Sequence, residues 1–426
     1  MQITVPKEIR QIIDNINSLG YEAYLIGGAV RDMILNIPSN DYDLCTNMPL
    51  DQVKELLPGF KLMKENNHRN TGIIKINSQE IEISSFHGKT IEEDLFKRDF
   101  TINAIACDKD GNLIDPYNGV EEIKNKTISL VDKSGSGIDI DPLRILRALR
   151  FQAIYDFSID EDTKQVMTSK VELLDNVAVE RIYNELIKIL TSANPSKTIR
   201  DNKETFCALI KELYITVGFK QNNPYHIYDV FEHTLKVLEN TPNNKYLRLA
   251  ALFHDIGKPA TYTVDEKGAG HFYGHEFISA KIFLDFAKKY KIDKKTTALV
   301  RKLIIDHDRT MSVKPTKINY FIKENGIEYV DLLYSLKEAD IRGQNPDWIE
   351  KRVLELNKEK EMYHTQLDKK IPLRVSDLKI NGNKLKELGI EGKQIGIVLK
   401  AIHEKVLAEE LENEENVLED YAKKKR

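Results

Sequence analysis

The run LIGGAVRD (residues 25–32), followed by NDYDL (residues 40–44), decides how the first part of this sequence folds. Residues 21–26 are mostly aromatic and apolar, which predicts a strand that ends at the glycine pair. We expect a helix to begin after the glycines, so that its first N–H groups face a phosphate. A glycine pair is common in turns, so this interpretation depends on the residues that follow.

Two carboxylates follow at positions i and i+2. Asp41 and Asp43 share one face of the chain if residues 40–44 are extended, because strand side chains alternate between faces. Paired carboxylates that leave coordination positions open for a nucleotide's phosphates suit divalent cations. An ordinary polar turn is the alternative for an isolated pair, but the upstream glycines favour the metal site.

The composition is that of a soluble globular protein with more than one domain. The chain has 426 residues, of which 41% are hydrophobic and 31% are charged. No apolar run is long enough to span a membrane, and charged residues come too early for a signal peptide, so we expect a cytoplasmic protein. Three separated cysteines argue against a disulfide framework. The net charge of −4 argues against non-specific coating of nucleic acid.

Helix and strand patterns alternate over the first 125 residues, and helical spacing dominates from about residue 141. We therefore predict an α+β fold class, with a mixed sheet and helices at the N-terminus and an all-helical remainder. Clusters of glycine, serine, asparagine and proline mark breaks at residues 134–137, 192–195, 221–224 and 343–346.

A basic ridge is predicted after the pair Asp141-Pro142. The aspartate suits a helix N-cap, and the proline suits the first turn. Arg144, Arg147 and Arg150 recur every third residue and share one helical face. Because a planar guanidinium binds two acceptors at once, this face favours phosphate and base contacts over a merely solvated surface.

These motifs resemble those of the class II tRNA nucleotidyltransferases, the CCA-adding enzymes and bacterial poly(A) polymerases of the polymerase-β-like superfamily. The runs that carry the resemblance are LIGGAVRD (25–32), DYD (41–43), EDLFKRDFTINA (93–104), DPYNG (115–119), DPLRILRALRF (141–151) and ERIYNEL (180–186). They span residues 20–190 in the family's order. The resemblance implies a polymerase-β-like head followed by a helical neck.

The resemblance also implies a role for each matched residue. Asp41 and Asp43 would be catalytic and would bind Mg²⁺, while Gly28 and Arg31 would cradle phosphates. The further nucleotide-binding residues that it implies are Arg98, Asp99, Asn103, Asp141, Arg144, Arg147 and Arg150. Asp141 and Arg144 would read the base, because cytosine and adenine both present an amino donor beside an acceptor nitrogen.

Two positions depart from the family's pattern. Ile140 stands where the family usually has a glutamate, so an orienting role falls to Asp139 or is absent. His87 stands where many relatives have an arginine, so no basic contact is assigned there. Glu82 is either a third carboxylate near the metals or an outward-facing strand residue.

A second set of metal-ligating residue types lies in the helical half. The run LFHDIGK (residues 252–258) places a His-Asp pair at the end of an apolar helix, where such groups need partners. With histidines and an aspartate on flanking helices, it resembles an HD phosphohydrolase domain. The ligands implied are His233, His254, Asp255 and Asp340 for one metal, and His275 and His307 for a second, with His271 as an alternative to His275. Imidazole and carboxylate suit a divalent transition metal, whose bound water attacks phosphate esters.

We therefore predict a template-independent RNA nucleotidyltransferase that adds CCA to tRNA 3′ ends from CTP and ATP and releases pyrophosphate. The predicted partners are tRNA, CTP and ATP, and no membrane. The alternatives left open are a poly(A) polymerase, an enzyme that adds only CC or only A, an HD phosphohydrolase with a nucleotide-sensing head, and an RNA-binding protein without turnover. A segment near residues 58–70 is expected to influence which nucleotides are added.

Four parts are predicted along the chain. They are a nucleotidyltransferase head (1–130), a helical neck with the base-reading motif (131–195), an HD phosphohydrolase-like domain (220–345) and a helical tail that would contact tRNA (346–426).

Overall fold

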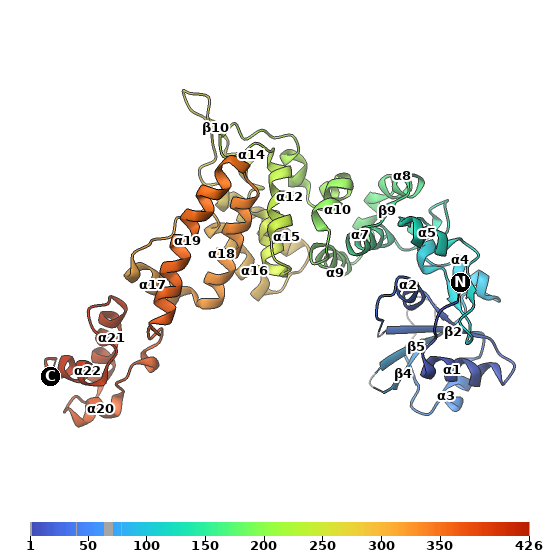
Figure 1. Cartoon of the computed structure of the whole chain (residues 1–426), viewed down its shortest axis with the longest axis horizontal. Helices are drawn as coiled ribbons and strands as arrows, with labels where there is room; N and C mark the ends of the chain where they lie inside the picture. The colour runs from blue at the N-terminus through green and yellow to red at the C-terminus, as the bar shows by residue number, and fades with distance from the viewer. Residues whose placement is uncertain (1, 40, 64–70, 78, 426) are drawn as a thin grey trace. The chain divides into compact units, whose positions relative to one another are not determined.

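The computed structural model describes residues 2–39, 41–63, 71–77 and 79–425. The chain divides into two compact units, Met1–Leu209 and Ile210–Arg426 (Figure 1). Residues 64–70, which belong to the segment expected to influence nucleotide choice, lie outside the described residues.

A seven-stranded sheet forms the core of the first unit, in the order β3-β4-β5-β2-β1-β6-β7. Its strands are β1 (Ala23–Ile26), β2 (Asp41–Thr46), β3 (Lys61–Leu62), β4 (Thr71–Ile76), β5 (Gln79–Ser85), β6 (Ala106–Cys107) and β7 (Leu113–Ile114). β2 pairs with β1 in the antiparallel sense and with β5 in the parallel sense. The sheet is therefore mixed, as predicted, and β2 lies inside it with a neighbour on each side.

Short helices accompany the sheet. They are α1 (Lys7–Asn17), α2 (Gly28–Ile34), α3 (Leu50–Leu56), α4 (Ile91–Phe96) and α5 (Gly119–Asn125), with the 3-10 turn η1 (Thr101–Asn103). α1 buries four isoleucines spaced three and four residues apart, which gives the helix one apolar face. α1 and α3 lie side by side beneath the sheet in the view of Figure 1.

Helices follow the sheet within the same unit. They are α6 (Ser136–Ile140), α7 (Arg144–Tyr155), α8 (Glu161–Ser169), η2 (Val171–Asn176), α9 (Val179–Leu190), α10 (Pro195–Asp201) and α11 (Lys203–Leu209). α7 packs against α9. A two-residue parallel pair of β8 (Thr127–Ile128) and β9 (Ser158–Ile159) interrupts the helices.

The expected N-cap at Asp141 is wrong. α7 begins at Arg144 with Leu143 as its N-cap, whereas Asp141 is the C-cap of the short helix α6. Among the described residues, no side-chain hydrogen bond caps the N-terminus of α7, so the Asp141 side chain is available for a contact other than capping.

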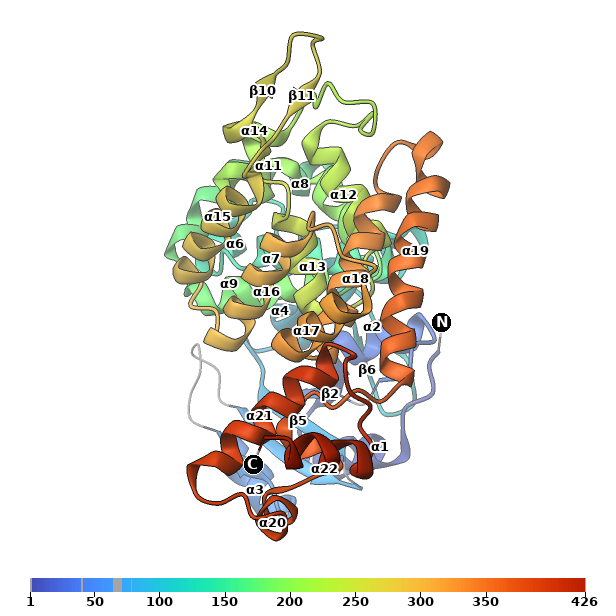
Figure 2. The same cartoon turned by 90° about the vertical axis from the view of Figure 1, so that its left-hand side faces the viewer.

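The second unit is built from helices that surround a buried cluster of histidine and aspartate side chains. They are η3 (Lys211–Thr216), α12 (Val230–Asn240), α13 (Lys245–Phe253), α14 (Lys258–Thr261), α15 (His275–Lys289), α16 (Lys294–Asp306), α17 (Pro315–Asn325), α18 (Ile327–Arg342) and α19 (Pro346–Asp368). α13 packs against α12, α15, α16 and α18. A ribbon of β10 (Thr263–Val264) and β11 (Gly270–His271) projects at the top of Figure 2.

The C-terminal residues of this unit enclose a small core of their own. Its elements are η4 (Val375–Asp377), α20 (Gly382–Glu387), α21 (Lys393–Leu407) and α22 (Glu415–Lys423). Leu385, Ile402 and Leu418 are fully buried there. Asn319 on α17 donates to the carbonyl of Leu407 at 3.0 Å, which ties this core to the helices before it. No helix of the described chain is long and apolar enough to cross a membrane.

Candidate functional site

The glycine turn between β1 and α2 is as tight as the sequence predicts. Gly27 has φ of 69°, a left-handed conformation that favours glycine. A Cβ built at Gly27 would lie 2.9 Å from Nη1 of Arg98, so the absent side chain also leaves room for this guanidinium. α2 begins at Gly28, directly after the turn. The turn therefore brings backbone N–H groups and an arginine to one place.

The two predicted carboxylates lie on one face of β2. Asp41 is exposed and Asp43 is half-buried, whereas Tyr42 between them is buried on the opposite face. Glu82 on β5 is the register partner of Asp43, so its side chain is on the same face of the sheet. Carboxylate oxygens gathered in this way are the ligands that Mg²⁺ prefers.

Arg31 on α2 is held by aromatic rings from α7. Its guanidinium carbon lies 5.0 Å from the ring centroid of Phe151 and 4.8 Å from that of Tyr155. Its Nε donates to Asp32 at 3.0 Å, and the Tyr155 hydroxyl donates to the same carboxylate at 2.9 Å. Nη1 of Arg31 donates to the side-chain oxygen of Asn103. These contacts fix the direction of the Arg31 guanidinium in the last turn of α2.

Asp99 connects the sheet of the first unit to the arginine ridge of α7, which consists of Arg144, Arg147 and Arg150. It accepts from Nδ2 of Asn103 at 2.9 Å and from Nε of Arg147 at 2.8 Å. Burial alone would raise its pKa, but Arg147 and the hydrogen bond from Asn103 lower it from 3.8 to about 2. Asp99 is therefore a fixed anion that positions its two neighbours.

The other ridge residues take different partners. Arg144 donates to the backbone carbonyls of Arg98 and Lys97 at 3.1 and 2.8 Å. Arg150 donates to Glu185 on α9 at 3.2 Å. Asp141, which caps no helix N-terminus, forms an ion pair with the Arg181 guanidinium at 3.3 Å.

All the predicted nucleotide-site residues line one open cavity of about 420 Å³. Its lining includes Gly28, Arg31, Asp41, Asp43, Arg98, Asp99, Asn103, Asp141, Arg144, Arg147 and Arg150. Carboxylates and guanidinium groups thus face the same space. Such a space can hold metal ions and a polyanion together.

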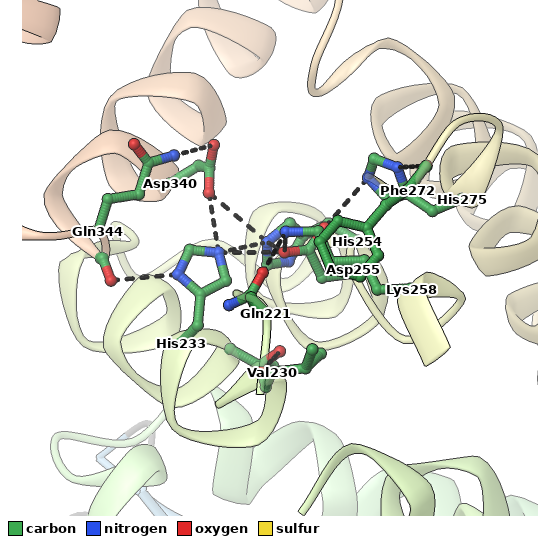
Figure 3. A network of polar contacts seen from close by, with 12 residues as sticks. Gln221, Val230, His233, His254, Asp255, Lys258, Phe272, His275, Asp340 and Gln344 are labelled. Carbon is green, nitrogen blue, oxygen red and sulfur yellow. Dashed lines mark hydrogen bonds and ion pairs between the residues drawn. The ribbon is translucent and has the colours of Figure 1, made fainter. Parts of the chain in front are cut away.

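In the second unit, the two oxygens of Asp255 face different sets of imidazoles (Figure 3). Oδ2 lies 3.1 Å from Nε2 of His233 and 3.3 Å from Nε2 of His254. Oδ1 lies 3.1 Å from Nε2 of His275 and 3.6 Å from Nε2 of His307.

Asp340 completes the first of these sets. Its Oδ1 lies 3.0 Å from Nε2 of His233. Although burial acts to raise it, the pKa of Asp255 lies well below its ordinary value because His254 and Lys258 are adjacent. The other five predicted ligands are therefore brought together near the buried carboxylate of Asp255.

The backbone sets the orientation of these four histidines. Their Nδ1 atoms lie within hydrogen-bonding distance of backbone carbonyls, at Gly343 (3.1 Å), Ala251 (2.8 Å), Phe272 (2.8 Å) and Ile304 (2.6 Å). A carbonyl only accepts, so each Nδ1 carries a proton and each Nε2 faces the cluster. This is the tautomer that a metal-ligating histidine needs, so the residues fit a divalent metal.

His271 is not interchangeable with His275. Its Nε2 lies 3.0 Å from Asp265 on the ribbon of β10 and β11, whereas His275 contacts Asp255. The alternative that gives His271 the place of His275 is therefore wrong, because the ribbon holds His271 away from the shared carboxylate.

Sequence reasoning missed several residues of the second site. Lys258 lies in the quoted run, yet its Nζ contacts Asp255 Oδ2 at 2.6 Å and donates to Gln221 at 2.9 Å. Tyr225 and Trp348 come from far apart in the chain, and their ring centroids are 5.0 Å apart. The cavity of about 530 Å³ at the histidine cluster is lined by these aromatic rings, Lys351 and Arg352. Of these residues, only Lys258, three positions after Asp255, lies close enough in the sequence to the His-Asp pair to have been predicted.

Comparison with known families agrees with this geometry. The family described as "Poly A polymerase head domain" matches residues 23–90 and 84–129, and "HD domain" matches residues 225–342. "Probable RNA and SrmB- binding site of polymerase A" matches residues 156–205. The chain thus has a poly(A) polymerase head and an HD domain.

This head and HD domain occur together in a chain that is similar to CCA-adding enzymes. The CCA-adding enzyme of Ligilactobacillus salivarius (strain UCC118) is 26% identical, over 99% of this chain and 97% of that protein. The chain spans about half the length of other curated relatives that it matches, which are also CCA-adding enzymes. These matches confirm the predicted resemblance.

Two solved structures share the fold of the whole chain. The Bacillus stearothermophilus CCA-adding enzyme in complex with CTP gives a TM-score of 0.69 at 23% identity, covering 99% of this chain and 98% of that one. The Thermotoga maritima CCA-adding enzyme complexed with tRNA gives a TM-score of 0.63 at 24% identity, covering 100% of both. The predicted fold class, a polymerase head followed by helices and an HD domain, is confirmed.

Proposed function

We propose that this protein is a CCA tRNA nucleotidyltransferase, which transfers CMP and AMP from CTP and ATP to tRNA 3′ ends without a template. One observation carries the proposal: a single cavity joins the carboxylates of β2 to the arginines of α7. The similar CCA-adding enzymes with CTP and with tRNA support the choice of substrates. Because tRNA and nucleoside triphosphates are cytoplasmic molecules, we infer that the protein acts in the cytoplasm.

Asp41 and Asp43 would hold Mg²⁺, since their oxygens share one face of β2 and open into the cavity. Mg²⁺ held by these two carboxylates would lower the pKa of the RNA 3′-hydroxyl and would offset the charge of the triphosphate. The carboxylate pair positions the hydroxyl for in-line attack on the α-phosphate, and pyrophosphate leaves.

The cations of the cavity would bind the triphosphate. Arg31 is aligned by Phe151 and Tyr155, and the first N–H groups of α2 lie beside it. Arg98 lies at the glycine turn, where a side chain at Gly27 would displace it. A phosphate chain placed along this wall gains charge-assisted hydrogen bonds from donors that are already oriented.

Asp141 and Arg144 would select the base. The Arg144 guanidinium is held by carbonyls of the head, and Asp141 is paired with Arg181. Cytosine and adenine offer an amino donor beside an acceptor nitrogen, which such a carboxylate and guanidinium complement. Uracil and guanine present the reverse pattern and would leave both groups unsatisfied.

The test is incorporation of CTP and ATP into tRNA that lacks its 3′ CCA. Asp41→Asn and Asp43→Asn each remove a carboxylate oxygen and should reduce incorporation at least about 100-fold, while Asp51→Asn on the exposed side of α3 serves as a matched control. Incubation with CTP alone, ATP alone and both separates CCA addition from CC-only, A-only and poly(A) addition. Undiminished incorporation by both variants would overturn the metal site.

The HD domain favours a second activity, metal-dependent hydrolysis of phosphate esters. The observation is the set of imidazole Nε2 atoms directed at both oxygens of Asp255. His233, His254, Asp255 and Asp340 would hold one divalent transition metal, with His275 and His307 completing a second site. A bound metal would turn water into a nucleophile at neutral pH. Hydrolysis of 2′,3′-cyclic nucleotides with added Ni²⁺ or Mn²⁺ tests this activity, which His254→Gln should abolish without loss of nucleotide incorporation.

A further inference from the structure

We propose that an aromatic shelf at the C-terminal end of α4, formed by Phe96, Lys97 and Tyr117 from the turn before α5, binds the last nucleoside of the RNA acceptor by stacking. The proposal rests on the proposed nucleotidyl transfer and assigns the part of the site that receives the growing end. It concerns residues that the nucleotide-binding motifs leave without a role.

Phe96 presents an apolar ring to solvent at the end of a short helix. It is the last residue of α4 and is 43% exposed. Its ring centroid lies 6.0 Å from that of Tyr117, and the planes are tilted by 44°. The ammonium of Lys97 lies 5.9 Å from the Phe96 centroid. An exposed ring beside a cation is the combination that stacks a base and binds its phosphate.

Tyr117 makes the shelf rigid. Its hydroxyl donates to the carbonyl of Glu92 at 3.2 Å, and its ring packs against a buried cluster that includes Leu95 and Ala104. Burial, with Glu92 nearby, raises the pKa of Tyr117, so the phenol keeps the proton that it donates. A ring fixed in this way loses little conformational freedom when a base stacks on its neighbour.

The cavity beside the shelf adjoins the catalytic cavity, because the two share lining residues. It borders a cavity of about 370 Å³ lined by His87, Glu92, Glu93, Phe96, Lys97 and Tyr117. His87 and Lys97 also line the cavity that contains Asp41 and Asp43. A chain lying on the shelf therefore leads into the space where the 3′-hydroxyl has to arrive.

The position of the shelf favours the acceptor over the incoming nucleotide. The base-reading pair Asp141 and Arg144 comes from the neck, whereas every lining residue of the shelf cavity comes from the head. In the proposed function, Arg31 and Arg98 already bind the triphosphate, and Arg144 already reads the base. Glu92 and Glu93 also line this cavity. Their carboxylates repel a triphosphate, but they can accept hydrogen bonds from exocyclic amines of an acceptor base.

The experiment measures KM for the acceptor and for CTP separately, with a tRNA minihelix that lacks CCA. Phe96→Ala should raise the acceptor KM about ten-fold, since loss of one stacked base has that order of effect, and leave the CTP KM unchanged. Phe96→Trp should restore the wild-type acceptor KM. Leu19→Ala, an exposed apolar residue that is 55% exposed and lies after α1, is the matched control.

A binding readout separates failure of the shelf from failure of the proposed activity. A minihelix with 2-aminopurine as its last nucleotide should lose fluorescence on binding the wild type and Phe96→Trp, and should keep it with Phe96→Ala. If the wild type incorporates CTP but Phe96→Ala changes neither the acceptor KM nor the fluorescence, the shelf is no RNA subsite and the activity stands. Absence of incorporation by the wild type would instead count against the proposed function, while the fluorescence still decides the shelf.

Discussion

Asp99 and Arg147 form a hydrogen-bonded ion pair between the loop after α4 and helix α7, with Nε of Arg147 2.8 Å from Oδ2 of Asp99. The pair joins the loop after α4 to the row of arginines on α7, within the first unit. Because Asn103 donates to the other oxygen of Asp99 at 2.9 Å, the same carboxylate also holds the residue that contacts Arg31. One buried anion thus positions two groups that line the nucleotide cavity.

Removing this anion should weaken the fold in a pH-dependent way. The pKa of Asp99 falls from 3.8 to about 2 on folding, so its stabilising effect is complete above pH 4 and is lost as the pH falls toward 2. Asp99→Asn should lower the free energy of unfolding by about 2 kcal/mol near pH 7. Urea unfolding of both proteins at pH 7, 4 and 3 checks this. A deficit that stays constant over that range would contradict the assignment.

The aromatic contacts of Arg31 predict a graded loss of nucleotide affinity. Tyr155→Phe removes the hydrogen bond to Asp32 and keeps the ring over Arg31, whereas Tyr155→Leu removes both. A cation–π contact contributes about 1 kcal/mol or more when it is partly buried, so Tyr155→Leu should raise the KM for CTP about five- to ten-fold and Tyr155→Phe should raise it less. Equal values for both variants and the wild type would show that Arg31 does not need this support.

The shared carboxylate of the HD domain predicts a metal stoichiometry. After loading with Mn²⁺, the wild type should bind two ions per chain, His275→Gln should bind one, and Asp255→Asn should bind neither tightly, because Asp255 faces both sets of imidazoles. His271→Gln is the control, since His271 contacts Asp265 instead. Elemental analysis of the dialysed proteins measures the content. One ion retained by Asp255→Asn would contradict the shared role.

Most predictions for the two sites came from short patterns in the sequence. The glycine turn, the spacing of Asp41 and Asp43, and the His-Asp pair are short-range features, and each has a direct structural consequence such as a positive φ or a shared strand face. The mixed sheet and the helical remainder followed from hydrophobic spacing in the same way.

Such patterns could not predict contacts between residues that are far apart in the sequence. Tyr155 lies 123 positions from Asp32 in the sequence. Nothing in the sequence around either residue indicates that their side chains form a hydrogen bond. Trp348 and Tyr225 meet only because α19 packs against the body of the second unit. The N-cap prediction at Asp141 failed for a related reason: the short helix α6 ends there, and its existence depends on packing rather than on capping residues.

The central claim, that one cavity of the head and neck builds CCA, is tested most directly by sequencing tRNA 3′ ends. A tRNA that lacks CCA is incubated with the protein and all four nucleoside triphosphates, and the products of the wild type and Asp43→Asn are compared. We predict that the wild type adds C, C and A in that order and that the variant leaves the ends unextended. Ends extended equally by both proteins, or wild-type ends without cytidine, would contradict it.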